Sequence, residues 1–183
     1  MARALGLSTE AVRRGLQTFA GSPDVNPGRG HLFEIGGVRV FVDFAHNPRG
    51  MRAIVDLMQA FPAKRRLIVL GQAGDRDDAS IRDLVRAACA LAPDQVIVKE
   101  MLSYLRGRAE GEIPALITTT LLDTGMPAAR ISQAPDEIAA LRQALAWARP
   151  GDLVVIPVHA SRDDVVQTVR ALVQRGWNPG EPV

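Results

Sequence analysis

The sequence predicts an α/β fold in which helices cover both faces of a doubly wound, mostly parallel sheet. Continuous apolar runs rich in Val, Ile and Leu recur along the chain, and such runs are typical of strands buried on both faces. Segments with apolar residues at helical spacing alternate with these runs. Near the N-terminal end, two β-rich runs are separated only by Gly36-Gly37, which predicts a hairpin.

The expected elements start with a short helix that Ser8 can cap, with Val12, Leu16 and Phe19 along one side. After the hairpin, Asn47 and Pro48 open the first of several helices that alternate with strands. Right-handed crossovers then give a Rossmann-like domain to which the hairpin adds an antiparallel edge. We expect strands at 31–35, 38–44, 66–71, 95–99, near 130–132 and at 153–158, and helices around 51–58, 81–91, 113–117, 138–145 and 165–173.

Composition limits the class of protein. The chain has 183 residues, of which 47% are hydrophobic and 23% charged, and these values fit one globular domain. No apolar run is long enough to cross a bilayer, and no secretory signal is visible at the N-terminus. The single cysteine, Cys89, cannot form an internal disulfide, so we expect a cytoplasmic protein without membrane contact.

The charge pattern gives little support for nucleic-acid binding. The net charge is only +2, although 20 arginines stand against two lysines. These arginines are scattered along the chain and no aromatic residues interleave with them. We therefore expect no nucleic-acid partner.

The polar residues of interest collect in four loops that follow predicted strands. In a parallel sheet these loops meet at the carboxyl edge, where such folds bind nucleotides and anionic substrates. Helix capping alone explains some of these residues, so a site is a hypothesis at this point. The four loops are 43–47, 71–78, 100–112 and 159–164.

Asp43, His46 and Asn47 form the first loop of the expected site. A carboxylate can accept hydrogen bonds from ribose hydroxyls, and an imidazole can contact a phosphate. The structural alternative makes Asp43 a turn residue, His46 a hydrogen-bonding group within the fold, and Asn47 a helix cap. The local pattern leaves both interpretations open.

The second loop, 71–78, is rich in glycine, and its backbone N–H groups together with Asp75 and Arg76 could receive an anion. It contains neither G-x-x-x-x-G-K-S/T nor G-x-G-x-x-G, so no complete phosphate-binding motif is present. This absence also disfavours a dinucleotide-dependent oxidoreductase. The acids at the end of the loop could instead serve only the dipole of the following helix.

The remaining two loops carry Glu100, Arg106, Arg108 and His159. Paired arginines can grip a carboxylate, although a solvated surface loop would look similar. His159 can serve the site or a hydrogen bond within the fold. We expect His31, at the start of the hairpin, at the surface. The sequence shows no Cys/His metal cluster and no G-x-S-x-G motif.

The stretch Asp43-Phe44-Ala45-His46-Asn47-Pro48 resembles the D-Y/G-A-H-N-P signature of the C-terminal domain of the Mur ligase superfamily. Within that superfamily the likeness is greatest to the Mur-like C-terminal part of cyanophycin synthetases. It covers most of the chain in the right order. The other similar stretches are Asn26-Pro27-Gly28-Arg29, Gly74-Asp75-Arg76, Lys99-Glu100, Leu105-Arg106-Gly107-Arg108, Gly111-Glu112, Pro135-Asp136-Glu137 and 151–156.

The resemblance implies an ATP-dependent ligase that forms an amide bond through an acyl phosphate. Residues 31–178 would be the C-terminal, ligand-binding domain, 23–30 a linker, 1–22 the tail of a preceding ATPase domain, and 179–183 a tail. The partners of this domain would be ATP, an incoming amino acid, a carboxylate acceptor and the ATPase domain. The ATPase domain would supply most ligands of a magnesium ion. The isolated chain would then be inactive, because it contains no P-loop.

The resemblance also implies roles for the loop residues. His46 would be catalytic and would bind the nucleotide with Asp43 and Asn47. The incoming amino acid would contact Asp75, Arg76, Glu100, Arg106, Arg108 and His159.

One departure concerns the residues after Lys99-Glu100. In cyanophycin synthetases the residues here are acidic, which suits the binding of arginine as substrate. In this chain they are Met101-Leu102-Ser103-Tyr104. A cationic amino acid would lose its counter-charge, so we hypothesise that arginine is not the substrate. An alternative from another class is a non-catalytic Rossmann-like binding or assembly module that keeps the fold without the chemistry.

Overall fold

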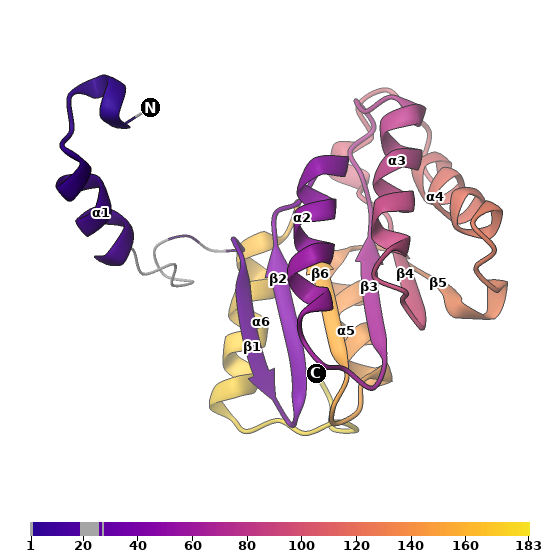
Figure 1. Ribbon diagram of the computed structural model, residues 1–183. Coiled ribbons are helices and arrows are strands. Elements are labelled where there is room, and N and C mark those ends of the chain that lie inside the picture. Colours follow the sequence, from indigo (N-terminus) through magenta and orange to yellow (C-terminus); the bar gives the residue numbers. More distant parts are fainter. Residues whose placement is uncertain (1, 19–25, 27) are drawn as a thin grey trace.

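The computed structural model describes residues 2–18, 26 and 28–183, and in these residues six strands form one sheet in the order β1-β2-β6-β3-β4-β5. Only β1 (His31–Ile35) and β2 (Val38–Asp43) pair antiparallel, and they lie at one edge. The parallel strands, visible in Figure 1, are β2, β6 (Leu153–Pro157), β3 (Arg66–Leu70), β4 (Gln95–Lys99) and β5 (Ile131–Ala134). The expected parallel sheet with a hairpin edge is confirmed.

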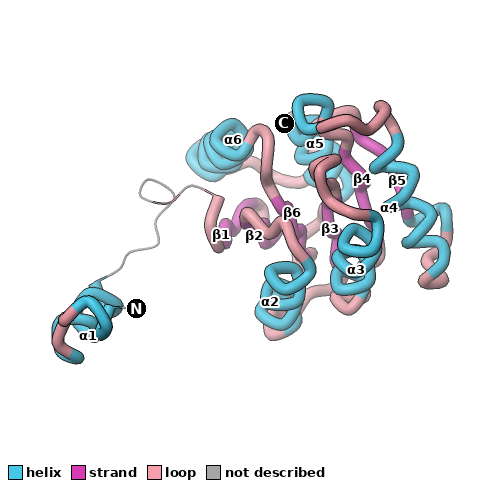
Figure 2. Tube along the Cα trace, turned by 90° about the horizontal axis from the view of Figure 1, so that it is seen from above, coloured by secondary structure: helices cyan, strands magenta, loops and turns pink. Residues whose placement is uncertain are grey.

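Helices cover both faces of this sheet, as Figure 2 shows from above. On one face lie α2 (Pro48–Gln59), α3 (Asp78–Cys89) and α4 (Glu112–Asp123), and on the other lie α5 (Glu137–Trp147) and α6 (Arg162–Gln174). Before the sheet come a short 3-10 helix, η1 (Ala2–Leu5), and α1 (Thr9–Thr18). Phe19, expected on the apolar side of α1, lies outside the described residues. Two further 3-10 turns are η2 (Leu102–Tyr104) and η3 (Ala128–Arg130).

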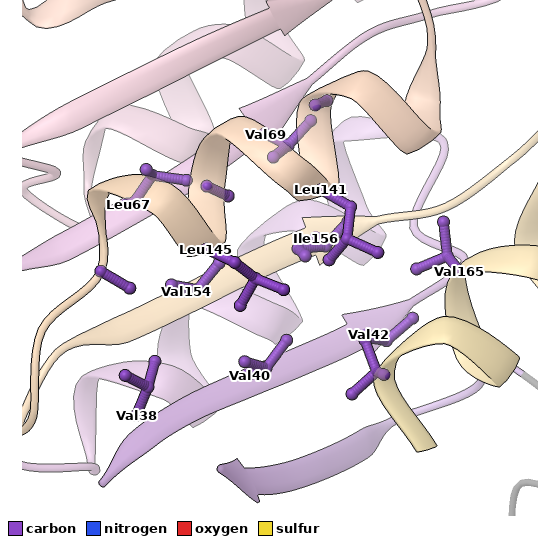
Figure 3. Close-up of a cluster of buried hydrophobic side chains, with 14 of the residues drawn as sticks. Val38, Val40, Val42, Leu67, Val69, Leu141, Leu145, Val154, Ile156 and Val165 are labelled. Carbon is purple, nitrogen blue, oxygen red and sulfur yellow. The ribbon is translucent and has the colours of Figure 1, made fainter. Parts of the chain in front are cut away.

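The hydrophobic core has two halves because successive strand residues point to opposite faces. Val40 and Val42 of β2 pack toward α5 and α6, whereas Phe41 between them packs toward α2 and α3. Figure 3 shows the first half, in which Leu141 and Leu145 of α5 lie over strand valines and isoleucines. The aliphatic core that the composition suggests therefore holds the layers together.

The element boundaries follow from local chemistry. Gly36 and Gly37 have φ of 53° and 74°, the left-handed conformation that a two-residue hairpin turn requires. Asn47 caps α2, since its Oδ1 accepts a hydrogen bond from the Gly50 N–H at 2.8 Å, and Pro48 follows as the first helical residue. The expected bounds of β1 and β4 match the observed ones, and those of the other strands differ by at most two residues at either end.

His31 corrects one expectation, because it is buried rather than at the surface. Its Nε2 lies 2.6 Å from the carbonyl oxygen of Asn26. The ring thus anchors the segment that precedes the hairpin. Its position in the first residue of an edge strand gave no sign of this contact.

The strand order creates a crevice at the carboxyl edge. β6 lies between β2 and β3, but its following helix α6 covers the opposite face from α2 and α3. Loops that leave neighbouring strands toward opposite faces open a space between them, which is where such sheets bind ligands. The helices in the described part of the chain are too short or too polar to cross a lipid bilayer.

Candidate ligand-binding site at the carboxyl edge

A cavity of about 180 Å³ opens in this crevice, and all four predicted loops contribute to its lining. Its polar lining consists of His46 after β2, Gln72 and Arg76 after β3, Arg106 after β4 and His159 after β6. The structure therefore brings together four of the residues that the sequence singled out. Gln72 was not among them.

The apolar part of the lining comes from Phe44, Ala73, Met101 and Tyr104. The Phe44 ring contacts both histidines, with ring centroids 5.2 Å from that of His46 and 5.6 Å from that of His159. Across the cavity, the guanidinium of Arg106 lies 5.1 Å from the centre of the Tyr104 ring. Aromatic side chains thus hold the polar groups in place on both sides.

A second, smaller cavity continues from the first between the N-termini of α2 and α3. His46, Gln72 and Arg76 line both cavities, and Asn47 and Ser80 line only this one. The positive ends of two helix dipoles lie at this cavity and favour an anion, while the cap side chains of Asn47 and Asp77 accept from the Gly50 and Ser80 N–H groups. The two cavities together fit a ligand with an anionic group attached to a larger polar body.

His159 forms part of the wall of the first cavity. Its side chain is 8% exposed. Its Nε2 lies 2.9 Å from the carbonyl oxygen of Ala45, so this nitrogen carries the ring proton and donates a hydrogen bond to that oxygen. Burial, together with the nearby charge of Lys99, lowers the pKa of His159 to about 3. The ring is therefore neutral at physiological pH.

A buried ion pair lies behind this histidine. Lys99, at the end of β4, contacts the carboxylate of Glu137 in the first turn of α5, and its Nζ donates to the Pro157 carbonyl oxygen at 2.6 Å. Burial lowers the pKa of Lys99 in spite of the opposite charge beside it. Burial would raise the pKa of Glu137, but Lys99 and backbone donors hold it below its usual value. The pair joins β4, α5 and β6.

Glu137 also fixes the loop that carries His159. Its carboxylate accepts hydrogen bonds from the backbone N–H groups of His159 at 2.7 Å and Ser161 at 2.5 Å. The side chain of Lys99 reaches Glu137 past Gly71, where a Cβ would lie 2.6 Å from Lys99 Cγ. Sequence reasoning missed Lys99 and Glu137 as partners, since a lysine after an apolar strand and a glutamate in a first helical turn are usually solvated.

Arg108 and Glu100 support the loop after β4 and do not line either cavity. Arg108 donates to the carbonyl oxygens of Gly74 and Arg76 and pairs with Asp78 and Glu112. Glu100 accepts from the backbone N–H groups of Met101 and Gly111, each at 2.7 Å. The contacts of Arg108 attach the loop after β4 to the loop after β3, and those of Glu100 hold the loop after β4 together. Of the two expected arginines, Arg106 therefore lines the cavity and Arg108 supports the loop that carries it.

Asp75 and Asp43 lie just outside the lining. Asp75 pairs with Arg106 and thereby helps to place its guanidinium. The carboxylate of Asp43 accepts a backbone hydrogen bond from Gly30, and burial raises its pKa in spite of this bond and of the nearby Arg29. Asp43 therefore attaches the segment before the hairpin to the end of β2.

Within the described ranges, no three or more His, Cys, Asp or Glu side chains gather in a group that could hold a metal ion.

Residues 28–157 match the family model described as "Mur ligase, glutamate ligase domain". This match covers more than half of the 183 residues. The chain belongs to the Mur ligase family. The matched residues include the first three loops at the carboxyl edge and end with β6, so the loop 159–164 lies beyond the match.

Mur ligase relatives are found by sequence and by structure. The chain is 38% identical to a cyanophycin synthetase from Synechocystis sp., over 82% of the chain and 17% of the relative. It is 31% identical to the UDP-N-acetylmuramoyl-L-alanyl-D-glutamate–2,6-diaminopimelate ligase of Gloeobacter violaceus, over 84% and 29% of the two chains. The structure of Mycobacterium tuberculosis folylpolyglutamate synthase complexed with ADP superposes with a TM-score of 0.58 at 22% identity, covering 97% of this chain and 38% of the other.

The chain thus spans less than a fifth of the length of the cyanophycin synthetases that it matches. The structural likeness, at low identity, concerns the fold. The sequence resemblance to this ligase family and to cyanophycin synthetases is confirmed by the family match and by these relatives.

Proposed function

We propose that residues 31–178 form the C-terminal domain of an ATP-dependent ligase that joins an amino acid to a carboxylate acceptor, and that the cavity described above receives the incoming amino acid. The observation that carries this proposal is the convergence of His46, Arg76, Arg106 and His159 from four separate loops on one cavity. Family membership and relatives whose printed names are those of ligases support it.

In this proposal the second cavity faces the phosphates of ATP. His46 and Arg76 line it, and the N-termini of α2 and α3 favour negative charge there. Asn47 contributes by capping α2, and Asp43 by holding the end of β2 and the segment before it. The nucleotide supplies the phosphoryl group that activates the acceptor carboxylate. A magnesium ion would be held mainly by a separate ATPase domain and would neutralise phosphate charge there.

The reaction then needs an amine at the edge of the nucleotide site. The acceptor carboxylate takes the terminal phosphoryl group of ATP and releases ADP, the amine of the amino acid attacks the acyl carbon, and phosphate leaves as the amide forms. In this proposal His46 contacts the transferred phosphoryl group, and its position in the lining of both cavities supports that role. In this proposal Arg76 and Arg106 hold the amino acid's carboxylate, and Asp75, Glu100 and Arg108 position their loops.

Replacing His46 by alanine in the protein that includes the ATPase domain tests this function. We expect amino-acid-dependent ADP release to fall by roughly a hundredfold or more, because a contact to the reacting group is lost. The thermal unfolding midpoint should change little, since the histidine is only partly buried.

His31→Gln is the matched control, because His31 lies outside both cavities and a glutamine can still donate to the Asn26 carbonyl oxygen. This variant should keep its activity. A non-catalytic module, the alternative, predicts no ligase activity that depends on His46. Unchanged ADP release in the folded His46→Ala protein would therefore refute the ligase role.

A further inference from the structure

Two buried polar atoms without a hydrogen-bond partner belong to the walls of one cavity. In the described residues four such side-chain atoms occur, and Gln72 Nε2 and His159 Nδ1 are two of them. A buried amide without a partner is unfavourable, so folded proteins rarely keep one without a reason. Their presence around the same cavity indicates that a bound ligand completes their hydrogen bonding.

Gln72 is the better placed of the two to contact a ligand. It follows β3 directly after Gly71, its residue is 5% exposed, and it lines both cavities where they meet. Its carboxamide can present two N–H donors or one oxygen acceptor, and a turn of the amide exchanges them. The chain therefore holds a neutral, adaptable hydrogen-bonding group at the centre of the site.

The charge of the lining indicates which ligand this group meets. The nine side chains around the first cavity include two arginines and no Asp or Glu. The nearby Asp75 is paired with Arg106, whereas Arg76 is exposed and has no side-chain partner in the described part of the chain. A ligand with a second carboxylate would gain charge-assisted hydrogen bonds here, and a cationic side chain would meet like charges.

We propose that Gln72 is a ligand-binding residue that donates to a carboxylate of the incoming amino acid, and that this cavity selects an acidic amino acid over a cationic one. This inference rests on the proposed function, because only a ligase domain requires an amino acid at this place. Of the α-carboxylate and the side-chain carboxylate of the ligand, one binds Gln72 and the other binds the two arginines.

Gln72→Met tests the inference, since methionine has a similar length and no hydrogen-bonding group. Thermal unfolding of the free chain should show a higher midpoint, because the variant removes a buried amide that has no partner. Titration calorimetry with L-aspartate, L-glutamate, L-arginine and L-lysine should show the acidic pair binding at least about tenfold more tightly to the wild-type chain. The variant should lose about tenfold of that affinity.

Gln95→Met is the matched control at the opposite end of the sheet. Gln95 donates to Ser132 Oγ at 3.2 Å, so its replacement loses an existing hydrogen bond and should lower the unfolding midpoint without changing affinity. Opposite shifts of the unfolding midpoint in these two Gln→Met variants distinguish a ligand-binding residue from one that stabilises the fold.

Three results would overturn the inference: equal or tighter binding of arginine, unchanged affinity for acidic amino acids in Gln72→Met, or no binding of any of the four up to their solubility. The first two differ from a failure of the proposed function, which the His46→Ala assay detects. A ligase that depends on His46 but keeps its amino-acid preference in Gln72→Met refutes only the role of Gln72. Selective binding of acidic amino acids without His46-dependent ligation refutes only the ligase.

Discussion

At the scale of single residues, His159 shows how burial decides what a side chain can do. Its Nε2–H donates a hydrogen bond to the Ala45 carbonyl oxygen. Its Nδ1 is unprotonated and lies 3.9 Å from a Glu137 oxygen. Protonating that nitrogen would add charge in a buried place near Lys99. The ring therefore acts as a fixed, neutral part of the wall and not as a proton donor at physiological pH.

This neutrality predicts a pH dependence of stability. The folded pKa of about 3 lies below the usual 6.5, so between these values the unfolded chain binds more protons at this position. The contribution of His159 is fully present above pH 6.5 and is lost as the pH falls toward 3. NMR titration of the ring protons checks this, since His159 should not titrate near pH 6.5. A midpoint in that range would contradict the buried, neutral ring.

Residue identity alone predicted only part of the site. His46, Arg76, Arg106 and His159 stood out because polar residues after strands are visible in the sequence. Gln72 did not, since an uncharged amide in a glycine-rich loop gives no chemical signal until its burial is known. The same holds for buried partners that are far apart in sequence, such as Lys99 and Glu137.

At the scale of elements, Gly74 determines how two loops fit together. Its N–H donates to the Tyr104 carbonyl oxygen at 2.8 Å, and a Cβ at this position would lie 1.9 Å from the Leu105 carbonyl oxygen. The loop after β4 can therefore approach the loop after β3 only where no side chain stands. This approach places Tyr104 and Arg106 on the cavity.

Gly74→Ala should displace the loop after β4. We expect a loss of roughly 1–3 kcal/mol in unfolding free energy, because the clash is with backbone and cannot relax through a side chain, and weaker binding of amino acids. Urea unfolding and the calorimetry described above measure both effects.

Gly50→Ala is the control within α2. Its Cβ would meet Asn47 Oδ1 at 3.5 Å, an ordinary contact, so stability should rise by about 0.5–1 kcal/mol with affinity unchanged. If Gly74→Ala lowered neither stability nor affinity, as expected of Gly50→Ala, the two loops would not depend on each other.

Elements were the most predictable level of this protein. The apolar runs and helical spacings gave the sheet, its hairpin edge and the helices after it, because each pattern continues over several residues. The 3-10 turn η2 and the attachment of its loop through Arg108 were not predictable, because they depend on contacts between separate loops.

At the scale of the whole molecule, the proposed chemistry is divided between this chain and an ATPase domain. The 183 residues contain no G-x-x-x-x-G-K-S/T sequence, so they lack the usual cradle for nucleotide phosphates. In the proposed ligase, the cavities here provide hydrogen-bond donors and receive the amino acid. Closure of an ATPase domain over this edge would complete the site.

The purified 183-residue chain should therefore not turn over ATP. An assay of ADP release, with each of the four amino acids and magnesium, should give the rate of the buffer alone. The His46→Ala chain serves as the control for contaminating ATPases. Hydrolysis by the wild-type chain that vanishes in this variant would contradict the proposed division.

The buried pair Lys99–Glu137 has a consequence for how selectivity can change in this fold. It fixes β4, α5 and the loop of His159 from behind the cavity, whereas residues 101–108 are attached from the front through Gly74 and Arg108. Exchange of the front segment can alter which side chain is admitted while the rear wall keeps its shape. Under the proposed function, a change of substrate would require exchange of this front loop alone, over a rear wall that the buried pair holds in place.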